Sequence, residues 1–545
     1  MQSVSAPVLS ISQLSVRAVV SGHHVVDNVS FDIGRGETVC VVGESGSGKS
    51  VTAFSVMGLL ARDALVPASG RILVAGEDVL AASPQRMREL RATGMAMVFQ
   101  EPMTALNPVM SVGQQIDEVL REHRRLGAAE RRARVLAMLE AVHLPDVAAV
   151  YAAYPHQLSG GQRQRIVISM ALILEPKLLI ADEPTTALDV TTQAQILSLI
   201  KELQQRNDTA VLFITHDFGV VSEIADRIVV MNRGQVVEQG ERDAMLARPT
   251  QAYTRMLVSS VPSLVPRKRD APTGDVVLEV AGLNKVYAEK RFLRAARTVA
   301  AAQDVDLNLR RGEIVGIVGE SGSGKSTVAR CIMRLIDPTS GTVRVCGKNI
   351  ETLSARELRP WRRKFQIVFQ DPYRSLNPRV RVADSMVEGM VNFGTPRAEA
   401  LRRATELMGL VGLDANAMQR YPHQFSGGQR QRICIARALA VSPDVLVADE
   451  AVSALDVSVQ AQVLALLEEI RVLTGVLVLF ITHDLRVAAQ ICDTILVMQR
   501  GRVVEAGTAE QVLTQPKQTY TQALIDAAPG RHWNFQDFAP ATRDH

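Results

Sequence analysis

The sequence is poor in aromatic residues and in cysteines, and each shortage disfavours a class of protein. Phe, Trp and Tyr make up 4% of the 545 residues, which argues against a nucleic-acid binder that stacks bases on aromatic rings. Five scattered cysteines form no CxxC pair. They indicate neither a zinc nor an iron–sulfur site, and a reduced cytosolic setting is expected.

Signals for secretion and membrane insertion are also missing. The opening residues MQSVSAPVLSISQLSV contain no basic segment followed by an apolar one, so no signal peptide is expected. The run Ile166–Leu174 is among the longest apolar stretches, whereas a membrane span needs about 18 residues. A net charge of +4 is typical of an ordinary solvated surface rather than a polyanion-binding face. We therefore expect a soluble chain that acts at a membrane only through partners.

The most informative feature is an internal repeat of about half the chain. Five motifs occur twice in the same order, at offsets between 267 and 276 residues: VVGESGSGKS at 41 and IVGESGSGKS at 317, MVFQEPMTALNP at 97 and IVFQDPYRSLNP at 367, YPHQLSGGQRQRI at 154 and YPHQFSGGQRQRI at 421, LLIADEPTTALDV at 178 and VLVADEAVSALDV at 445, and LFITHD at 212 and 479. Such a period indicates a duplicated domain rather than a solenoid. We predict domains at 1–260 and 276–528, a solvated proline- and charge-rich linker at 261–275, and a tail at 529–545.

Each half reads as an α/β domain. Short apolar runs at 37–42, 177–181 and 210–214 are typical of buried parallel strands. A helix is predicted over 51–60 and a mostly helical insert over 110–151. The expected fold is two tandem P-loop nucleotide-binding domains, each with a mostly parallel sheet core and a helical subdomain.

GESGSGKS, present in both halves, is a Walker A loop. Its glycines let backbone N–H groups converge on phosphate oxygens, its lysine adds a charge, and its final hydroxyl ligates Mg²⁺. The predicted ATP-binding residues are Gly43, Ser45, Gly46, Gly48, Lys49 and Ser50 in the first half and Gly319, Ser321, Gly322, Gly324, Lys325 and Ser326 in the second. Ser50 and Ser326 are also predicted to bind Mg²⁺.

An apolar strand ending in Asp-Glu follows in each half and has the Walker B form. Asp182 and Asp449 suit Mg²⁺, and Glu183 and Glu450 suit orientation or deprotonation of the attacking water. A histidine lies 34 residues beyond each Walker B aspartate and is predicted to contact the γ-phosphate. The predicted catalytic residues are Glu183, His216, Glu450 and His483.

A second anion site is predicted where SGGQ begins an apolar helical run in each half. Small residues at a helix start leave N–H groups open at the positive end of the helix dipole. The residues expected to bind ATP there are Ser159, Gly161, Ser426 and Gly428.

Together these motifs resemble the ABC ATPase family over nearly the whole chain. The resemblance implies that Gln100 and Gln370 contact ATP and Mg²⁺, and that Ala187-Leu188-Asp189 and Ala454-Leu455-Asp456 are D-loops. It also implies that two domains sandwich each ATP head to tail. One site would join Lys49, Ser50, Gln100, Asp182, Glu183 and His216 with Ser426, Gly428 and Asp456. The other would join Lys325, Ser326, Gln370, Asp449, Glu450 and His483 with Ser159, Gly161 and Asp189.

The wording of the motifs is similar to the peptide/nickel importer branch of that family. Each half also ends in a related extension, RPTQAYT at 248–254 and QPKQTYT at 515–521, which resembles the C-terminal region of that branch. The resemblance implies import of dipeptides, oligopeptides or glutathione. Two membrane permeases, docked near 100–108 and 370–378, and a substrate-binding protein would be the partners. The chain would lie at the cytoplasmic face of the inner membrane.

One position differs between the halves in a way that bears on ATP. Many ABC ATPases stack adenine on an aromatic residue upstream of Walker A, and Tyr287 is the candidate in the second half. The comparable position in the first half is Ala18, so we expect the first site to bind adenine more weakly.

Other functions were weighed against peptide import. A tandem ABC ATPase that acts on ribosomes usually has a long charged arm between its domains, and DNA-repair relatives carry zinc cysteines. A nickel or sugar importer ATPase is a further alternative, although sugar-importer fusions often have one altered half. In this chain every residue expected to do chemistry is present in both halves.

Overall fold

The computed structural model describes residues 6–100, 105–186, 188–269, 272–289, 297–453 and 455–540. The chain divides into two compact units. The first comprises residues 1–188, 192–261 and 529–545, and the second comprises 189–191 and 262–528. The predicted linker therefore falls in the second unit from Pro262, and the predicted tail falls in the first. Ala187, Ala454 and residues 101–104 of the predicted docking region lie outside the described residues.

The first unit contains two sheets. An antiparallel sheet has the order β2-β1-β4-β5, formed by β1 (Leu9–Ala18), β2 (His24–Ile33), β4 (Leu65–Val74) and β5 (Glu77–Asp78). A six-stranded sheet has the order β10-β9-β3-β8-β7-β6, formed by β3 (Thr38–Val42), β6 (Met95–Val98), β7 (Leu178–Asp182), β8 (Ala210–Thr215), β9 (Arg227–Asn232) and β10 (Gln235–Glu241). All pairs in this sheet are parallel except β9–β10.

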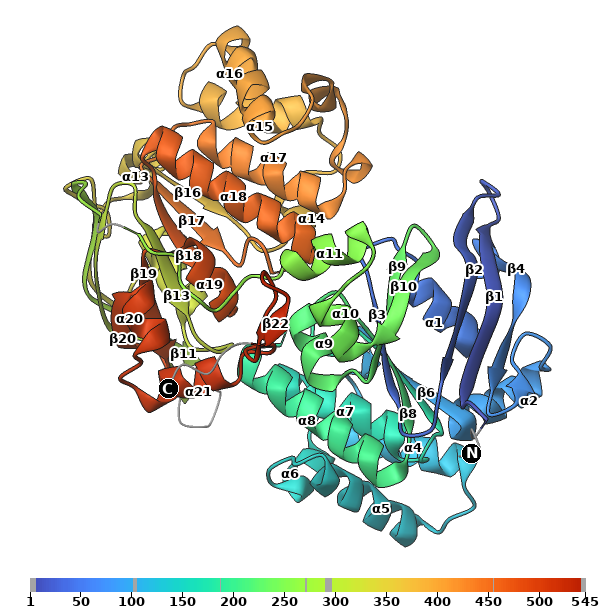
Figure 1. Ribbon diagram of the computed structural model, residues 1–545. Helices are drawn as coiled ribbons and strands as arrows, with labels where there is room; N and C mark the ends of the chain where they lie inside the picture. Colours follow the sequence, from blue (N-terminus) through green and yellow to red (C-terminus); the bar gives the residue numbers. More distant parts are fainter. Residues whose placement is uncertain are drawn as a thin grey trace. The chain divides into compact units, whose positions relative to one another are not determined.

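Helices surround these sheets. They are α1 (Lys49–Met57), α2 (Pro84–Glu89), a π-helical turn (Leu90–Gly94), α4 (Val112–His123), α5 (Ala128–Ala141), α6 (Val147–Ala152), a 3₁₀ turn (Pro155–Gln157), α7 (Gly160–Leu172), α8 (Val190–Asn207), α9 (Phe218–Ile224), α10 (Arg242–Ala247) and α11 (Ala252–Ser259). Helices α5 and α6 lie away from strands β1 and β2 (Figure 1) and belong to the helical subdomain.

The second unit repeats this plan. Its antiparallel sheet, β12-β11-β14-β15, consists of β11 (Val276–Glu289), β12 (Arg297–Arg310), β14 (Ser340–Val345) and β15 (Lys348–Asn349). Its six-stranded sheet, β16-β17-β18-β13-β19-β20, consists of β13 (Ile314–Val318), β16 (Phe365–Val368), β17 (Val445–Asp449), β18 (Leu477–Ile481), β19 (Thr494–Gln499) and β20 (Arg502–Thr508).

The helices of the second unit correspond to those of the first. They are α12 (Lys325–Ile332), α13 (Ala355–Trp361), α14 (Pro372–Ser375), α15 (Val382–Asn392), α16 (Arg397–Leu410), two 3₁₀ turns (Ala415–Gln419 and Pro422–Gln424), α17 (Gly427–Leu439), α18 (Val457–Thr474), α19 (Leu485–Ile491), α20 (Ala509–Thr514) and α21 (Thr519–Asp526). In Figure 1, α15 and α16 lie away from β11 and β20.

The apolar runs form the parallel strands because both faces of the sheet are covered. Every residue of β3, β7 and β8 is buried, which explains why these strands read as continuous rather than alternating hydrophobic segments. The predicted α/β class and the helical insert are confirmed. Among the described residues, no helix combines the length and the apolar character that a membrane crossing requires.

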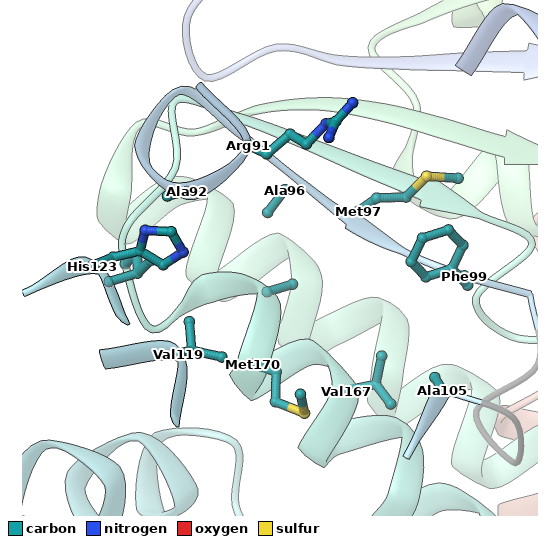
Figure 2. A pocket seen from close by; sticks show the side chains of 12 residues that line it. Arg91, Ala92, Ala96, Met97, Phe99, Ala105, Val119, His123, Val167 and Met170 are labelled. Atoms are coloured by element: carbon teal, nitrogen blue, oxygen red, sulfur yellow. The ribbon is translucent and has the colours of Figure 1, made fainter. Parts of the chain in front are cut away.

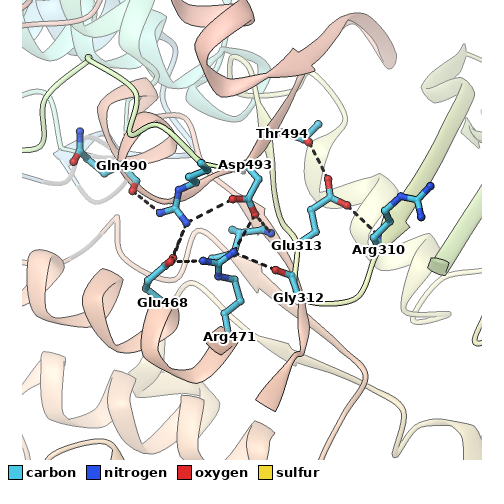
Figure 3. Close-up of polar contacts among 10 residues, drawn as sticks. Arg310, Gly312, Glu313, Glu468, Arg471, Gln490, Asp493 and Thr494 are labelled. Atoms are coloured by element: carbon cyan, nitrogen blue, oxygen red, sulfur yellow. Dashed lines mark hydrogen bonds and ion pairs between the residues drawn. The ribbon is translucent and has the colours of Figure 1, made fainter. Parts of the chain in front are cut away.

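Part of the predicted linker is ordered on the second unit, so the expectation that it is solvated is wrong for this part. The side chain of Arg269 is 13% exposed, donates to Glu468 at 2.9 Å and lies 3.6 Å from Asp493. Arg471 forms ion pairs with the same two carboxylates, and Figure 3 shows Glu468, Arg471 and Asp493 in one network. Asp493 in turn accepts the N–H of Ile314 at 2.7 Å, so the linker is tied to the start of β13.

The C-terminal residues 529–540 pack within the first unit. Strand β21 (Trp533–Asn534) pairs with β22 (Ala539–Pro540), and Phe535 is only 2% exposed. The N–H of Gly530 donates to Glu223 of α9 at 3.0 Å. The role of this segment was not read from the sequence, and the structure gives it a buried anchor.

Candidate nucleotide-binding sites

The first Walker A loop joins β3 to α1, and its own lysine donates hydrogen bonds to the start of the loop. Lys49 is buried, and its Nζ donates to the carbonyls of Gly43 at 2.7 Å and Glu44 at 2.9 Å. Gly43 and Gly48 have φ values of 152° and 100°. A Cβ on Gly43 would lie 2.2 Å from the carbonyl oxygen of Met231, so only glycine fits there. Gly48 precedes α1, and the loop thus brings N–H groups and a cation to a helix N-terminus, the chemistry of a phosphate site.

The second Walker A loop has the same geometry between β13 and α12. Lys325 donates to Gly319 O at 2.7 Å and Glu320 O at 2.8 Å. The remaining predicted residues follow in the same order: Ser45 and Gly46 lie in the first loop and Ser321, Gly322 and Gly324 in the second, whereas Ser50 and Ser326 are the second residues of α1 and α12. The lysine therefore makes the same two backbone contacts in both loops.

Each Walker B aspartate ends its strand beside the Walker A hydroxyl. Ser50 Oγ donates to Asp182 at 3.2 Å, and Ser326 Oγ donates to Asp449 at 3.0 Å. Burial raises the pKa of both carboxyls, although the serine hydroxyls act to lower it. A hydroxyl beside a carboxylate is a donor set that suits Mg²⁺, so these residues fit the predicted metal.

The Walker B glutamate of the first unit is held by two other predicted site residues. Its Oε2 accepts from Gln100 Nε2 at 2.8 Å, and its Oε1 lies 3.2 Å from Nδ1 of His216. Thr186 also donates to Oε2, at 3.0 Å. Burial acts to raise the pKa of Glu183, but the hydrogen bond and charge of His216 above all, together with the hydroxyl of Thr186 and the charge of Lys49, lower it to about 2. The carboxylate is therefore ionised at neutral pH, as a group that orients water must be.

The second unit repeats the arrangement. Gln370 Nε2 donates to Glu450 Oε2 at 2.8 Å, and His483 Nδ1 lies 3.6 Å from Oε1. The pKa of Glu450 is lowered by His483 against the effect of burial. The pKa of His483 is raised by Glu450, again against burial. Both glutamates have a left-handed backbone, with φ of 46° for Glu183 and 50° for Glu450, a strain typical of functional positions.

The signature residues begin α7 and α17 with a capping box in each unit. Ser159 Oγ accepts from Gln162 N at 3.2 Å and Ser426 Oγ from Gln429 N at 3.3 Å. The second glycine of each motif packs tightly on the following long helix. A Cβ on Gly161 would lie 2.5 Å from Thr192, and one on Gly428 would lie 2.2 Å from Val459. These two glycines are therefore needed for helix packing, in addition to any role in binding a ligand.

The other predicted residues lie on strands or beside helix starts. Tyr287 is on β11, 43% exposed, with the ammonium of Lys285 5.2 Å from its ring centre. Ala18 ends β1. In the D-loops, Asp189 accepts from Thr191 at 2.9 Å, and Asp456 is the N-cap of α18.

Two kinds of contact were missed by the sequence reasoning. Thr186 beside Glu183 was not singled out, although it lies three residues from it. Tyr253 and Tyr520 reach the Walker A loops of their own units. The tyrosine that recurs in both extensions is the sequence signal for these contacts.

Family models match most of both repeats. Residues 26–186 and 302–453 match a model described as ABC transporter. Residues 237–291 and 504–535 match one described as oligopeptide/dipeptide transporter, C-terminal region.

Known proteins align over nearly the whole chain. A glutathione import ATP-binding protein, GsiA, of Salmonella choleraesuis (strain SC-B67) is 45% identical, over 96% of this chain and 90% of its own. A peptidoglycan transport ATP-binding protein, YejF, of Agrobacterium fabrum is 45% identical over 96% of both chains. A solved structure, cbiO1 from Clostridium perfringens, part of the ABC transporter complex cbiONQ, is 30% identical with a TM-score of 0.40, over 45% of this chain and 92% of that one.

Proposed function

The chain belongs to the ABC transporter ATPases, and from this premise we propose that its two ATPase units power the import of peptides through a binding-protein-dependent transporter. The observation that carries the proposal is the C-terminal extension. Both units end in a region that matches the oligopeptide/dipeptide transporter model. The names of the two relatives differ in cargo, glutathione for one and peptidoglycan for the other, so the shared class rather than one compound is proposed.

The described residues support ATP hydrolysis in each unit. The Walker A lysines and loop N–H groups bind the phosphates. The mostly buried Glu183 and Glu450, held by His216 and His483, orient and polarise the attacking water. Ser50 with Asp182, and Ser326 with Asp449, would hold Mg²⁺ together with Gln100 and Gln370. The ion supplies positive charge for the β- and γ-phosphates.

We further propose that each ATP is bound by Walker A of one unit and the signature of the other. Membership of the ABC transporter ATPases supports this head-to-tail arrangement of the two units. In the first composite site, Lys49 would bind ATP together with Ser426 and Gly428. In the second, Lys325 would bind ATP together with Ser159 and Gly161. Closure on ATP and opening after hydrolysis would alternate the access of two permease subunits.

A cavity of about 230 Å³ in the first unit supports permease docking. It lies between β6 and α7, where Met97 and Phe99 face Val167 and Met170 (Figure 2). Phe99 is 41% exposed, and Ala105 lines the cavity beyond the residues that are not described. In the second unit Phe369 and Tyr373 are 38% and 62% exposed at the matching loop. An apolar surface of this kind fits a short helix from a membrane subunit.

Co-purification with membrane permeases, together with stimulation of ATPase activity by a peptide-loaded binding protein, tests the proposal. Phe99→Ser is expected to weaken the co-purification, whereas Val472→Ser, at an exposed site on α18, leaves it unchanged. The proposal places the chain peripherally on the cytoplasmic face of the inner membrane. Co-sedimentation with ribosomes in place of permeases, or stimulation by a nickel or sugar binding protein, would overturn it.

A further inference from the structure

The tyrosine of each C-terminal extension contacts the Walker A loop of its own unit. In the first unit the N–H of Glu44 donates to the hydroxyl of Tyr253 at 3.3 Å, and this hydroxyl lies 3.4 Å from Glu44 Oε2. In the second unit the N–H of Glu320 donates to the hydroxyl of Tyr520 at 3.2 Å. The partners are 209 and 200 residues apart in the sequence, so the same long-range contact occurs independently in both units.

The helices that carry these tyrosines are fixed to the six-stranded sheets. Glu238 on β10 accepts the N–H groups of Thr250 at 2.7 Å and Gln251 at 3.1 Å, just before α11. Glu505 on β20 does the same for Lys517 at 2.8 Å and Gln518 at 3.2 Å, just before α21. The threonines that follow the tyrosines, Thr254 and Thr521, are fully buried. The phenols are therefore presented by anchored helices rather than by loose ends.

The variation between the two extensions matches this geometry. The Tyr-Thr pair occurs in both copies, whereas the preceding residue is Ala252 in one and Thr519 in the other, and both of these are exposed. The residues that reach the loop or the interior are thus the ones that the two halves share.

Each tyrosine holds one end of a peptide plane whose other end is held by the Walker A lysine. The peptide between Gly43 and Glu44 gives its carbonyl to Lys49 at 2.7 Å and its N–H to Tyr253. The peptide between Gly319 and Glu320 is held in the same way by Lys325 and Tyr520. A phosphate loop works only if its peptides point N–H groups at the phosphate. A flip of this first peptide would break both bonds and disturb the turn that follows.

We propose that Tyr253 and Tyr520 are positioning residues for ATP, which fix the first peptide plane of each Walker A loop and couple the C-terminal extension to nucleotide binding. Burial raises the pKa of Tyr520 to about 12, so its phenol keeps the proton at neutral pH. The proposal rests on the ATP-binding role of the Walker A loops. It does not depend on the cargo or on the permeases.

The test uses the full-length chain without permeases. Tyr253→Phe and Tyr520→Phe keep the ring and remove only the hydroxyl. We expect each to raise the KM for ATP, and the Kd for ATP in a titration with hydrolysis blocked by Glu183→Gln and Glu450→Gln, by roughly three- to tenfold, as for the loss of one hydrogen bond. The kcat at saturating ATP stays within about twofold, because the group contacts the loop and not the reacting atoms.

Controls separate positioning from a role in folding. Met256→Ala on α11 and Gln522→Ala on α21 change exposed residues of the same helices and leave KM and kcat unchanged. A lower melting temperature of the Phe variants with unchanged KM and Kd would overturn the proposal and leave a structural role. An unchanged melting temperature together with unchanged KM and Kd would overturn the proposal as well. Failure of the chain to bind permeases would reject the proposed importer function without affecting these constants.

Discussion

His216 Nδ1 lies 3.2 Å from Oε1 of Glu183, and this contact keeps a mostly buried carboxyl ionised. Burial alone raises the pKa of Glu183, but its hydrogen-bonding neighbours lower it from 4.5 to about 2. Because the folded-state pKa is depressed, the group contributes stability that is present above about pH 4.5 and is lost as the pH falls toward 2. When Glu183 is fully ionised, its lowered pKa contributes on the order of 3 kcal/mol to the free energy of unfolding.

The variant His216→Ala removes the bond and leaves the burial. We therefore expect the pKa of Glu183 to rise, and the loss of stability between pH 5 and pH 3 to be smaller than in the wild type. Thermal unfolding over this pH range measures the difference. His143→Ala is the matched control, because His143 and its partner Glu202 are 61% and 52% exposed at a similar distance of 3.2 Å. An identical pH dependence in all three proteins would show that His216 does not set this pKa.

The two Walker A lysines are expected to be mutually dependent in transport. In the proposed head-to-tail arrangement, Lys49→Ala would impair the site completed by Ser426, and Lys325→Ala would impair the one completed by Ser159. If both sites must close for the permease to change its access, either variant reduces coupled transport far below half of the wild-type rate. Uptake of labelled peptide into vesicles, with Lys177→Ala as a control on an exposed lysine, gives the measurement. Single variants that retain about half of the transport rate would indicate two independent engines.

Local chemistry made the strands and the loop motifs predictable, while long-range packing did not. A Walker A loop and a buried strand carry their signals within about ten residues, and those of β3, β7 and β8 were found within one residue of their ends. The docking of Arg269 depends on Glu468, 199 residues away in the sequence, and on Asp493, which is farther still.

One comparison between the halves could have revealed this docking. At the constant offset of 267 residues, the first half has Lys201 in place of Glu468 but keeps an aspartate, Asp226, in place of Asp493. Only one of the two acidic partners of the linker arginine is therefore specific to the second half. For Tyr253 and Tyr520 the sequence shows only that a tyrosine recurs in both extensions. Their contacts with the Walker A loops and the burial of Phe535 depend on how distant segments pack.

Tyr287 is expected to make the second site bind ATP more tightly than the first. It is 43% exposed on β11, whereas Ala18 ends the corresponding strand β1. An aromatic platform contributes about 1–3 kcal/mol per stacked base in nucleic-acid complexes, so Tyr287→Ala should weaken binding at the second site about five- to a hundredfold. Site-resolved titration of the full chain, with either Lys49→Ala or Lys325→Ala to silence one loop, measures each affinity. Equal affinities in the parent, or no loss on Tyr287→Ala, would exclude this role.

We expect that Gly428, the second glycine of the signature, is needed mainly because a larger residue would not fit against α18. A Cβ at position 428 would lie 2.2 Å from Val459 Cγ1, so Gly428→Ala should destabilise the second unit by about 1–3 kcal/mol. The matched control Gly427→Ala has nothing within 4 Å of its Cβ and should cost little.

Adding Val459→Ala makes room for the new methyl group. A double-mutant cycle between the two positions should therefore show a favourable coupling, with the double variant more stable than the sum of the single changes implies. Thermal unfolding gives the stabilities, and ATPase activity gives a second readout. If the double variant regains stability but not ATPase activity, Gly428 is also needed for the approach of ATP, in agreement with the proposed composite site. If it regains neither, steric contact with Val459 is not the reason for the glycine.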